Sequence, residues 1–327
     1  MLKRGLSVFL AAALMILCFF SVPVFAAEPE FDISDYTIED LKTMTTAEKK
    51  KLMEDFIEAY NPYGLRDLME QEASTSGEFG VQPLWKSDGD DSEIGQQMAT
   101  HQLITLEALN VFISDYGFYE ANGSTALVVA LSLASASGLP DMLETDALTF
   151  SGHFYDPDTG KNWTRTTWPT AKTRASSHYD RAKTALNKDT TPEMPDLLGE
   201  NFEDALKQLG MSLHYVQDVC EPHHAANKTA GISTHTEFEN HIELHISSLM
   251  PSVSTISSVF YGRGRTKNIG DLTHEAAVIG KIYIDQTAEE YQSQWDEVGK
   301  TCLENSIWHS ARVIYKFFYE TNASFIK

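Results

Sequence analysis

Residues 201–240 read NFEDALKQLGMSLHYVQDVCEPHHAANKTAGISTHTEFEN, and this stretch decides the fold class of the chain. Apolar side chains recur at spacings of three and four through its first half, which predicts a helix that ends before Pro222. His214 and Asp218 lie four residues apart on this helix. Side chains at that spacing share one face, about 5–6 Å apart at Cβ, so an imidazole nitrogen and a carboxylate oxygen can bind one ion.

A second pair, His235 and Glu239, repeats the four-residue spacing. Between the two pairs, the break at Pro222 can direct His223 or His224 toward the same region. A single pair of this kind is usually solvated or part of a satisfied core. Two pairs and a histidine-bearing break in so short a stretch instead favour a metal site. Nitrogen and oxygen donors without thiolate are typical of open, catalytic zinc sites.

Other segments also show helical spacing, and none shows convincing strand alternation. We therefore expect an all-α fold built as a single helical domain. Besides the helix that carries His214, the expected helices cover residues 37–44, 46–60, 101–112, 124–137, 171–188, 243–250, 272–286 and 289–321.

The first 26 residues have the pattern of a secretory signal peptide. Two basic residues precede an apolar run, which ends in small residues suited to cleavage after Ala26. We therefore expect a secreted, extracellular protein. Cys220 and Cys302 remain after cleavage, and the sequence leaves open whether they form one disulfide or two buried thiols.

Residues 214–227, HYVQDVCEPHHAAN, resemble the signature of the secreted bacterial zinc-dependent phospholipase C family, which runs His-Tyr-x-x-Asp and then Pro-x-His-x-x-Asn. That spacing selects His224 over His223. His235 and Glu239 fall where the family has its next His-x-x-x-Glu pair.

Residues 153–160, HFYDPDTG, match this family almost letter for letter. The resemblance implies a single helical catalytic domain around a trinuclear zinc cluster. It also implies hydrolysis of the glycerol-side phosphodiester bond of phospholipids, such as phosphatidylcholine, to diacylglycerol and a phosphorylated headgroup. The substrate would be met at a membrane surface.

The resemblance further implies ligands for three zinc ions. Asp141, placed before His153 as in some family members, would also be the general base, although an acid after a proline is more often only a turn residue. One ion would be held by Asp141, His153, His214 and Asp218, a second by His224, His235, Glu239 and water, and a third by Trp85, His101 and Asp218, whose carboxylate would bridge two ions.

Mature members of the family begin with a tryptophan whose α-amino group and carbonyl oxygen both bind zinc. An α-amine has a pKa of about 7.7 to 8.0, so it loses its proton to a metal more readily than a lysine does. If Trp85 is that residue, residues 27–84 are a propeptide that a processing protease removes, and residues 85–327 are the catalytic domain. The alternative is that residues 27–84 are an acidic helical extension with a linker. We expect no additional lipid-binding domain of the kind that some relatives carry.

The motifs give opposing indications of the headgroup preference. Relatives that prefer phosphatidylcholine place an aromatic residue after the metal-binding aspartate, because an aromatic cage attracts a quaternary ammonium. Met142 stands at that position here. Phe150 retains another aromatic of the cage, and Asp88 could supply the nearby acid. Trp163 and Trp168 lie in a loop, where they either contact lipid headgroups or pack against the protein.

Two other functions are compatible with parts of the sequence. A zinc-dependent single-strand nuclease family shares the expected fold and the amino-terminal tryptophan. The net charge of −22 and the lack of a basic stretch argue against a nucleic-acid partner. A noncatalytic secreted zinc-binding protein would have saturated coordination and no turnover. We expect a monomer.

Overall fold

A computed structural model describes residues 31–69, 100–117, 123–144, 147–186 and 200–321. The described part of the chain is helical, and its one extended pairing is an isolated antiparallel bridge between Asp156 and Lys161. The predicted all-α fold is confirmed. The helices and 3-10 turns are η1 (Ile33–Asp35), α2 (Ile38–Thr43), α3 (Thr46–Tyr60), η2 (Pro62–Gly64), α5 (Thr100–Tyr116), α6 (Gly123–Ser137), α7 (Leu139–Leu143), α8 (Ala147–Phe150), η3 (Ser151–His153), α9 (Ala171–Leu186), α10 (Glu200–Asp218), α11 (Pro222–Ala225), η4 (Ala230–Ile232), α12 (His235–Leu244), α13 (Ile246–Leu249), α14 (Ser258–Arg265), α15 (Ile269–Lys281), η5 (Ile284–Thr287), η6 (Glu289–Gln294) and α16 (Trp295–Glu320).

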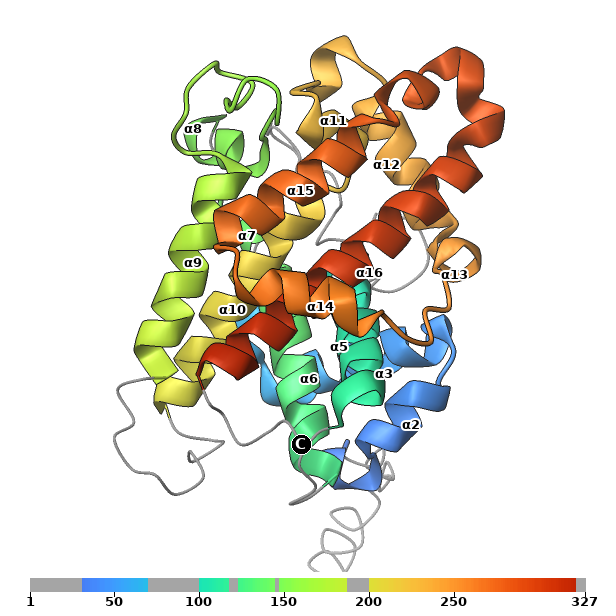
Figure 1. The fold of residues 1–327 in the computed structure, drawn as a ribbon. Coiled ribbons are helices and arrows are strands. Elements are labelled where there is room, and N and C mark those ends of the chain that lie inside the picture. The colour runs from blue at the N-terminus through green and yellow to red at the C-terminus, as the bar shows by residue number, and fades with distance from the viewer. Residues whose placement is uncertain (1–30, 70–99, 118–122, 145–146, 187–199, 322–327) are drawn as a thin grey trace, which may run out of the picture. The chain divides into compact units, whose positions relative to one another are not determined.

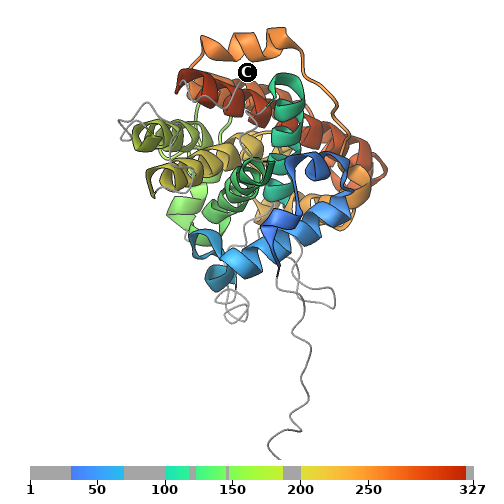
Figure 2. The ribbon, with the colours of Figure 1, turned by 90° about the horizontal axis from the view of Figure 1, so that it is seen from below.

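Helix α10 is the helix that the residues around His214 predict, and it lies at the centre of the packing. It contacts α9 and α6 most extensively and also touches α5, α15 and α16 (Figures 1 and 2). Every residue from Leu209 to Asp218 is buried. His214 and Asp218 therefore project into the protein interior and not into solvent.

Gly210 allows α10 to approach α6 closely. A Cβ atom at this position would lie 2.5 Å from the Cβ of Ala136 and 2.7 Å from the carbonyl oxygen of Leu133, both on α6. Only a residue without a side chain fits such a contact. The close approach brings Ser137, the last residue of α6, beside His214 on α10.

The amino-terminal helices α2 and α3 pack against α6, and α3 also contacts α5. Capping boxes at Thr37 and Thr45 begin the two helices, since each threonine accepts a hydrogen bond from a backbone amide three residues on. Lys49 on α3 forms an ion pair of 2.5 Å with Glu107 on α5, and both residues are buried. The chain from Ile33 onward forms one compact unit.

The structure differs from the sequence predictions in several helical regions. The segment expected at 243–250 is divided between the end of α12, at Leu244, and α13. The expected helix at 272–286 starts earlier, at Ile269, because Asn268 caps it, and it ends at Lys281. The helical segment expected at 289–321 begins with the 3-10 turn η6 before α16. Helix α14 was not predicted. It contains two glycines, which have low helix propensity, but Gly264 leaves room for the side chain of Arg312 on α16.

Cys220 and Cys302 are both buried free thiols, so the alternative without a disulfide is the one observed. Among the described residues, no helix combines the length and apolarity that a bilayer-spanning segment requires. The signal-peptide prediction for residues 1–26 lies outside the described residues.

Candidate metal centre

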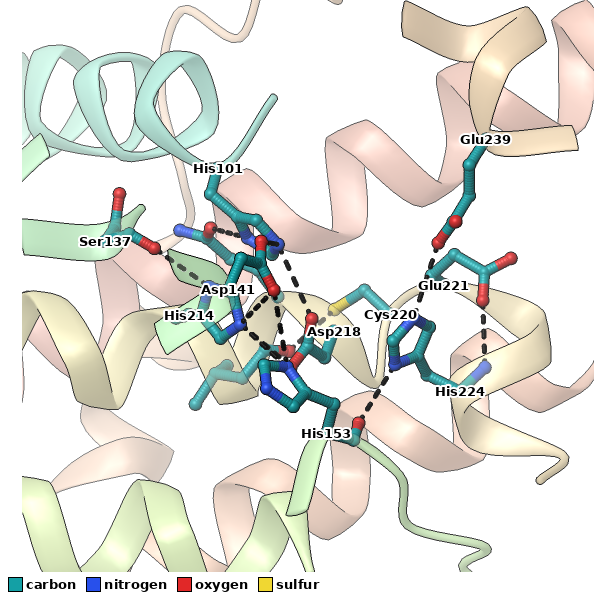
Figure 3. A network of polar contacts seen from close by, with 12 residues as sticks. His101, Ser137, Asp141, His153, His214, Asp218, Cys220, Glu221, His224 and Glu239 are labelled. Atoms are coloured by element: carbon teal, nitrogen blue, oxygen red, sulfur yellow. Dashed lines mark hydrogen bonds and ion pairs between the residues drawn. The ribbon is translucent and has the colours of Figure 1, made fainter. Parts of the chain in front are cut away.

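Two neighbouring groups of buried histidines and carboxylates lie where several helices end (Figure 3). In the first group, His214 and Asp218 come from α10, Asp141 from α7, His153 from the end of η3 and His101 from the start of α5. Each of these five residues is at most 2% exposed. Residues far apart in the sequence therefore present nitrogen and oxygen atoms to one buried region.

The donor atoms of the first group have the spacing of a tetrahedral metal site. Zinc bonds of 2.0 to 2.1 Å place neighbouring tetrahedral ligands about 3.3 to 3.4 Å apart. His214 Nε2 lies 2.9 Å from His153 Nδ1 and 3.3 Å from Asp218 Oδ2. Asp141 Oδ1 lies 3.3 Å from His214 Nε2 and 3.6 Å from His153 Nδ1. The four side chains predicted for one ion are thus brought together around a single point.

The second oxygen of Asp218 faces a different histidine. Asp218 Oδ1 lies 3.5 Å from His101 Nε2, while Asp218 Oδ2 belongs to the set just described. This is the arrangement that the predicted bridging carboxylate requires. The other members predicted for this part of the centre, Trp85 and the nearby Asp88, lie outside the described residues.

Hydrogen bonds from outside the group orient its histidines. The Nδ1–H group of His214 donates to the carbonyl oxygen of Ser137 at 2.8 Å, which turns Nε2 toward the carboxylates. The Nδ1–H group of His101 donates to Oε1 of Gln217 at 2.8 Å, with the same effect. Such bonds fix the tautomer that leaves the other nitrogen able to bind a metal. The sequence motifs did not indicate Gln217, although it lies between His214 and Asp218.

A further carboxylate lies behind His153. Glu144 Oε2 is 3.7 Å from His153 Nε2, and Glu144 Oε1 accepts a hydrogen bond of 2.8 Å from the hydroxyl of Tyr215. The guanidinium of Arg174 approaches the same oxygen at 3.3 Å. Glu144 was also missed. In the sequence, the one indication of Glu144 was its position three residues after Asp141.

The second group consists of His224 on α11, His235 and Glu239 on α12, and Glu221, all at most 4% exposed. Glu239 Oε1 lies 3.3 Å from His224 Nε2 and 3.0 Å from His235 Nε2. His224 Nδ1–H donates to the carbonyl oxygen of His153 at 3.0 Å, which links the two groups and directs Nε2 inward. The sequence motifs predicted three of these four residues and did not indicate Glu221.

His223 takes a different direction from its neighbour. Its Nδ1 lies 2.6 Å from Glu221 Oε1, and its Nε2 lies 3.1 Å from the hydroxyl of Thr287. His224, as the motif spacing predicted, is the member of the His-His pair that reaches the carboxylate of Glu239.

Burial controls the charge states of both groups. It raises the pKa of Asp141 and raises the pKa values of Asp218 and Glu239 well above the ordinary carboxyl range. Burial also lowers the pKa of His153, and of His214 and His224, to about 4 in each case. A neutral imidazole is the form that binds a metal, so the histidines are ready to coordinate at neutral pH.

Several donor atoms have no hydrogen-bond partner among the described residues. They include His224 Nε2, Asp141 Oδ2 and Glu239 Oε2. A buried polar atom without a partner costs about 1–3 kcal/mol. Divalent cations would satisfy these atoms and compensate for the clustered carboxylates. The residues present therefore fit metal ions, and nitrogen and oxygen donors at tetrahedral spacing suit zinc.

The predicted substrate residue Phe150 is buried beside the first group. Its ring lies 5.3 Å from the ring of His153 and 5.5 Å from that of Phe154, centroid to centroid. Met142, at the position of the expected cage aromatic, is also buried. Trp168 is 72% exposed, so the protein does not cover this side chain.

No protein-family model matches the chain. It is similar to a curated protein of Paraclostridium bifermentans named phospholipase C, with 27% identity over 239 residues, which cover 68% of this chain and 59% of that protein. A phospholipase C of Bacillus cereus is 31% identical over 169 residues, covering 46% of this chain and 53% of the relative. The chain thus spans less than two thirds of the length of these relatives. The alpha toxin of Clostridium absonum has a similar fold, with a TM-score of 0.57 and 21% identity over 72% of this chain and 65% of the toxin. The resemblance to bacterial phospholipases C that the motifs indicated is therefore confirmed.

Proposed function

We propose that this chain is a secreted zinc-dependent phospholipase C. It would cleave the glycerol-side phosphodiester bond of phospholipids to release diacylglycerol and a phosphorylated headgroup. The observation that carries the proposal is the pair of buried metal-ligand groups. A hydrogen bond from His224 to His153 links the two groups. The motifs that contain these two residues, 153–160 and 214–227, resemble those of this family, and relatives named phospholipase C support the assignment.

We assign three zinc ions to the centre. Asp141, His153, His214 and Asp218 would hold the first, His224, His235 and Glu239 the second, and His101, Asp218 and Trp85 the third. Bound zinc supplies Lewis acidity toward phosphate oxygens and lowers the pKa of a water molecule. The chain's own contribution is to fix the donors before substrate arrives, through the hydrogen bonds from His214 to Ser137 and from His101 to Gln217.

Asp141 is the residue we assign as the general base. It is 2% exposed, and its Oδ2 has no hydrogen-bond partner among the described residues. Oδ1 lies 3.3 Å from His214 Nε2, and Oδ2, which lies 3.7 Å from His101 Nε2, would accept the proton of an attacking water.

Residues 27–84 would be a propeptide. Of the donors that we assign to the third ion, His101 and Asp218 are among the described residues. While residues 27–84 are attached, Trp85 has no free α-amine to complete that ligand set. The contacts of α2 and α3 with α5 and α6 are consistent with a segment that accompanies folding before its removal.

Exposed apolar side chains support a lipid surface as the place of action. Leu143, Leu148 and Trp168 are 50%, 68% and 72% exposed, and the first two follow Asp141 in the chain. Hydrogen bonds of Asn162 connect the segments that carry Leu148 and Trp168. Its side-chain amide donates to the carbonyl oxygen of Pro169, the residue after Trp168, and to Ser151 Oγ. The hydroxyl of Ser151 donates to the carbonyl oxygen of Leu148. Exposed apolar groups of this kind can enter the headgroup region.

The test is headgroup release from phosphatidylcholine, phosphatidylethanolamine and sphingomyelin, with single-stranded RNA alongside. A protease site placed before Trp85 gives both forms from one folded, zinc-loaded preparation. Lipid turnover by the cut form, much weaker in the uncut form, would support the phospholipase and the propeptide together. RNA cleavage without lipid turnover would assign the chain to nucleases. Zinc binding without any turnover would leave a noncatalytic protein.

A further inference from the structure

Glu221 is a buried carboxylate that the sequence motifs did not assign to any ion. It is 0% exposed and stands at the N-cap of α11. Its Oε2 accepts a hydrogen bond from the backbone amide of His224 at 2.8 Å, and its Oε1 lies 2.6 Å from His223 Nδ1. These contacts hold the side chain in one orientation beside the second metal-ligand group (Figure 3).

The surroundings of Glu221 contain little positive charge. Within the part of the chain that the structure describes, its ion-pair contacts are to histidines alone, His223 and His235, and none is to lysine or arginine. Burying an ionised carboxylate without a strong cationic partner is costly. Glu239 lies in the same group, so two carboxylates share this small volume. A divalent cation between them would offset both charges.

The geometry places one oxygen of Glu221 within the second ligand set. Oε2 lies 3.8 Å from His235 Nε2, and one donor atom from each of Glu221, His224, His235 and Glu239 lies within 4.8 Å of the others. The 3.8 Å contact is somewhat longer than the distance of about 3.3 to 3.4 Å between ligands of a tetrahedral zinc ion, whereas the contacts of Glu239 Oε1 with both histidines, 3.0 and 3.3 Å, are not. The set therefore contains four side-chain donors, whereas the motifs assigned three and a water.

We propose that Glu221 is the fourth protein ligand of the second metal ion. The inference rests on the proposed metal centre and does not depend on the lipid substrate. Two imidazoles and two carboxylates would neutralise a divalent cation and leave no tetrahedral position for solvent, as in structural zinc sites. An ion held in this way would tie α11 to α12.

The experiment uses the chain from Ala27 loaded with cobalt, whose visible absorption reports coordination number and donor type. Glu239→Gln identifies the band that belongs to the second site, because Glu239 is already assigned there. Glu144→Gln is the matched control, since it removes the charge of a buried carboxylate that lies by His153 and outside the second group. Zinc affinity is measured in parallel by competition with a chelator.

Glu221→Gln should change the same band as Glu239→Gln and weaken zinc binding at that site more than 100-fold, beyond the 10- to 100-fold that loss of an orienting partner causes. Glu144→Gln should leave that band unchanged. The side-chain amide of Glu221→Gln retains an oxygen that can accept the hydrogen bond from the backbone amide of His224. We therefore expect this variant to fold, and the unfolding of its metal-free form checks that expectation.

An unchanged band in Glu221→Gln would overturn the proposal, whatever the affinity, and would make Glu221 an orienting partner of His223 and His224. If no variant and no wild-type protein bound cobalt, the metal centre itself would be wrong. Loss of lipid turnover alone would not bear on Glu221, because the readout is the metal spectrum.

Discussion

Replacement of Gln217 by methionine tests how the histidines of the first group are oriented. Gln217 is fully buried and makes three side-chain hydrogen bonds. Its Oε1 accepts from His101 Nδ1 at 2.8 Å, and its Nε2 donates to Thr105 Oγ1 at 2.9 Å and to Ser310 Oγ at 3.1 Å. Methionine has a similar length and helix propensity but can make none of these bonds.

The expected effect has two separable parts. Loss of three buried hydrogen bonds should lower the free energy of unfolding of the metal-free protein by about 3 kcal/mol, at about 1 kcal/mol for each bond. Loss of the bond that fixes the His101 tautomer should weaken the zinc ion bound by His101 by about 10- to 100-fold, or about 1.4 to 2.7 kcal/mol.

The assay is chelator competition for zinc, combined with urea unfolding of the metal-free protein, on the chain cut before Trp85. Thr105→Val is the control, because it removes one partner of Gln217 and leaves His101 in place. It should lose about 1 kcal/mol of stability with zinc affinity retained. Zinc affinity of Gln217→Met within about threefold of wild type, well below the loss expected for an orienting partner, would refute the reasoning. Either the Gln217 contact would not orient His101, or His101 would not bind zinc.

Three further outcomes are expected. Gly210→Ala should lower the free energy of unfolding by about 1–3 kcal/mol, because the new Cβ would overlap Ala136 on α6; an unchanged urea midpoint would contradict the close approach of α10 and α6. Burial lowers the pKa of His178 to about 4, below the value of about 6.5 in the unfolded chain. The neutral side chain therefore contributes fully to stability above about pH 6.5, and the free energy of unfolding falls by at most about 3 kcal/mol as the pH drops to about 4. His178→Asn should flatten the pH profile of metal-free unfolding by that amount, and a profile identical to wild type would argue against this role of His178. Trp168→Ala should weaken binding to phosphatidylcholine vesicles severalfold while headgroup release from a soluble short-chain lipid is retained, and equal vesicle binding by both proteins would remove Trp168 from the lipid surface.

Local patterns were sufficient for the helix class and for much of the candidate site. The three- and four-residue spacing that predicted α10 follows from the period of the helix, and so does the shared face of His214 and Asp218. The motif spacing also selected His224 over His223, and the structure directs His224 toward Glu239. The assignment of these residues to metal ions remains a prediction, as do the roles of Asp141 and Phe150, the assignments at Trp85 and Asp88, and the propeptide boundary.

The residues that were missed have no local signature. Gln217 acts through His101, and Glu144 acts on His153, so each partner lies on another segment of the chain. Glu221 stood inside the quoted stretch, but a carboxylate before a proline is ordinarily a helix cap, and Glu221 has that contact too. Its proximity to His235 depends on where α12 lies relative to α11 in the folded chain.

The sequence by itself determined most of the helical segments, because side-chain periodicity and capping residues act within a few residues of each other. It also determined the donor types of the site. Only the tertiary structure decided which atoms converge. Gly210 sets the distance between α6 and α10, and packing brings α5, α7, α10 and η3 to one buried point. Burial there shifts the pKa values of the histidines and carboxylates, a consequence of desolvation that no sequence spacing encodes.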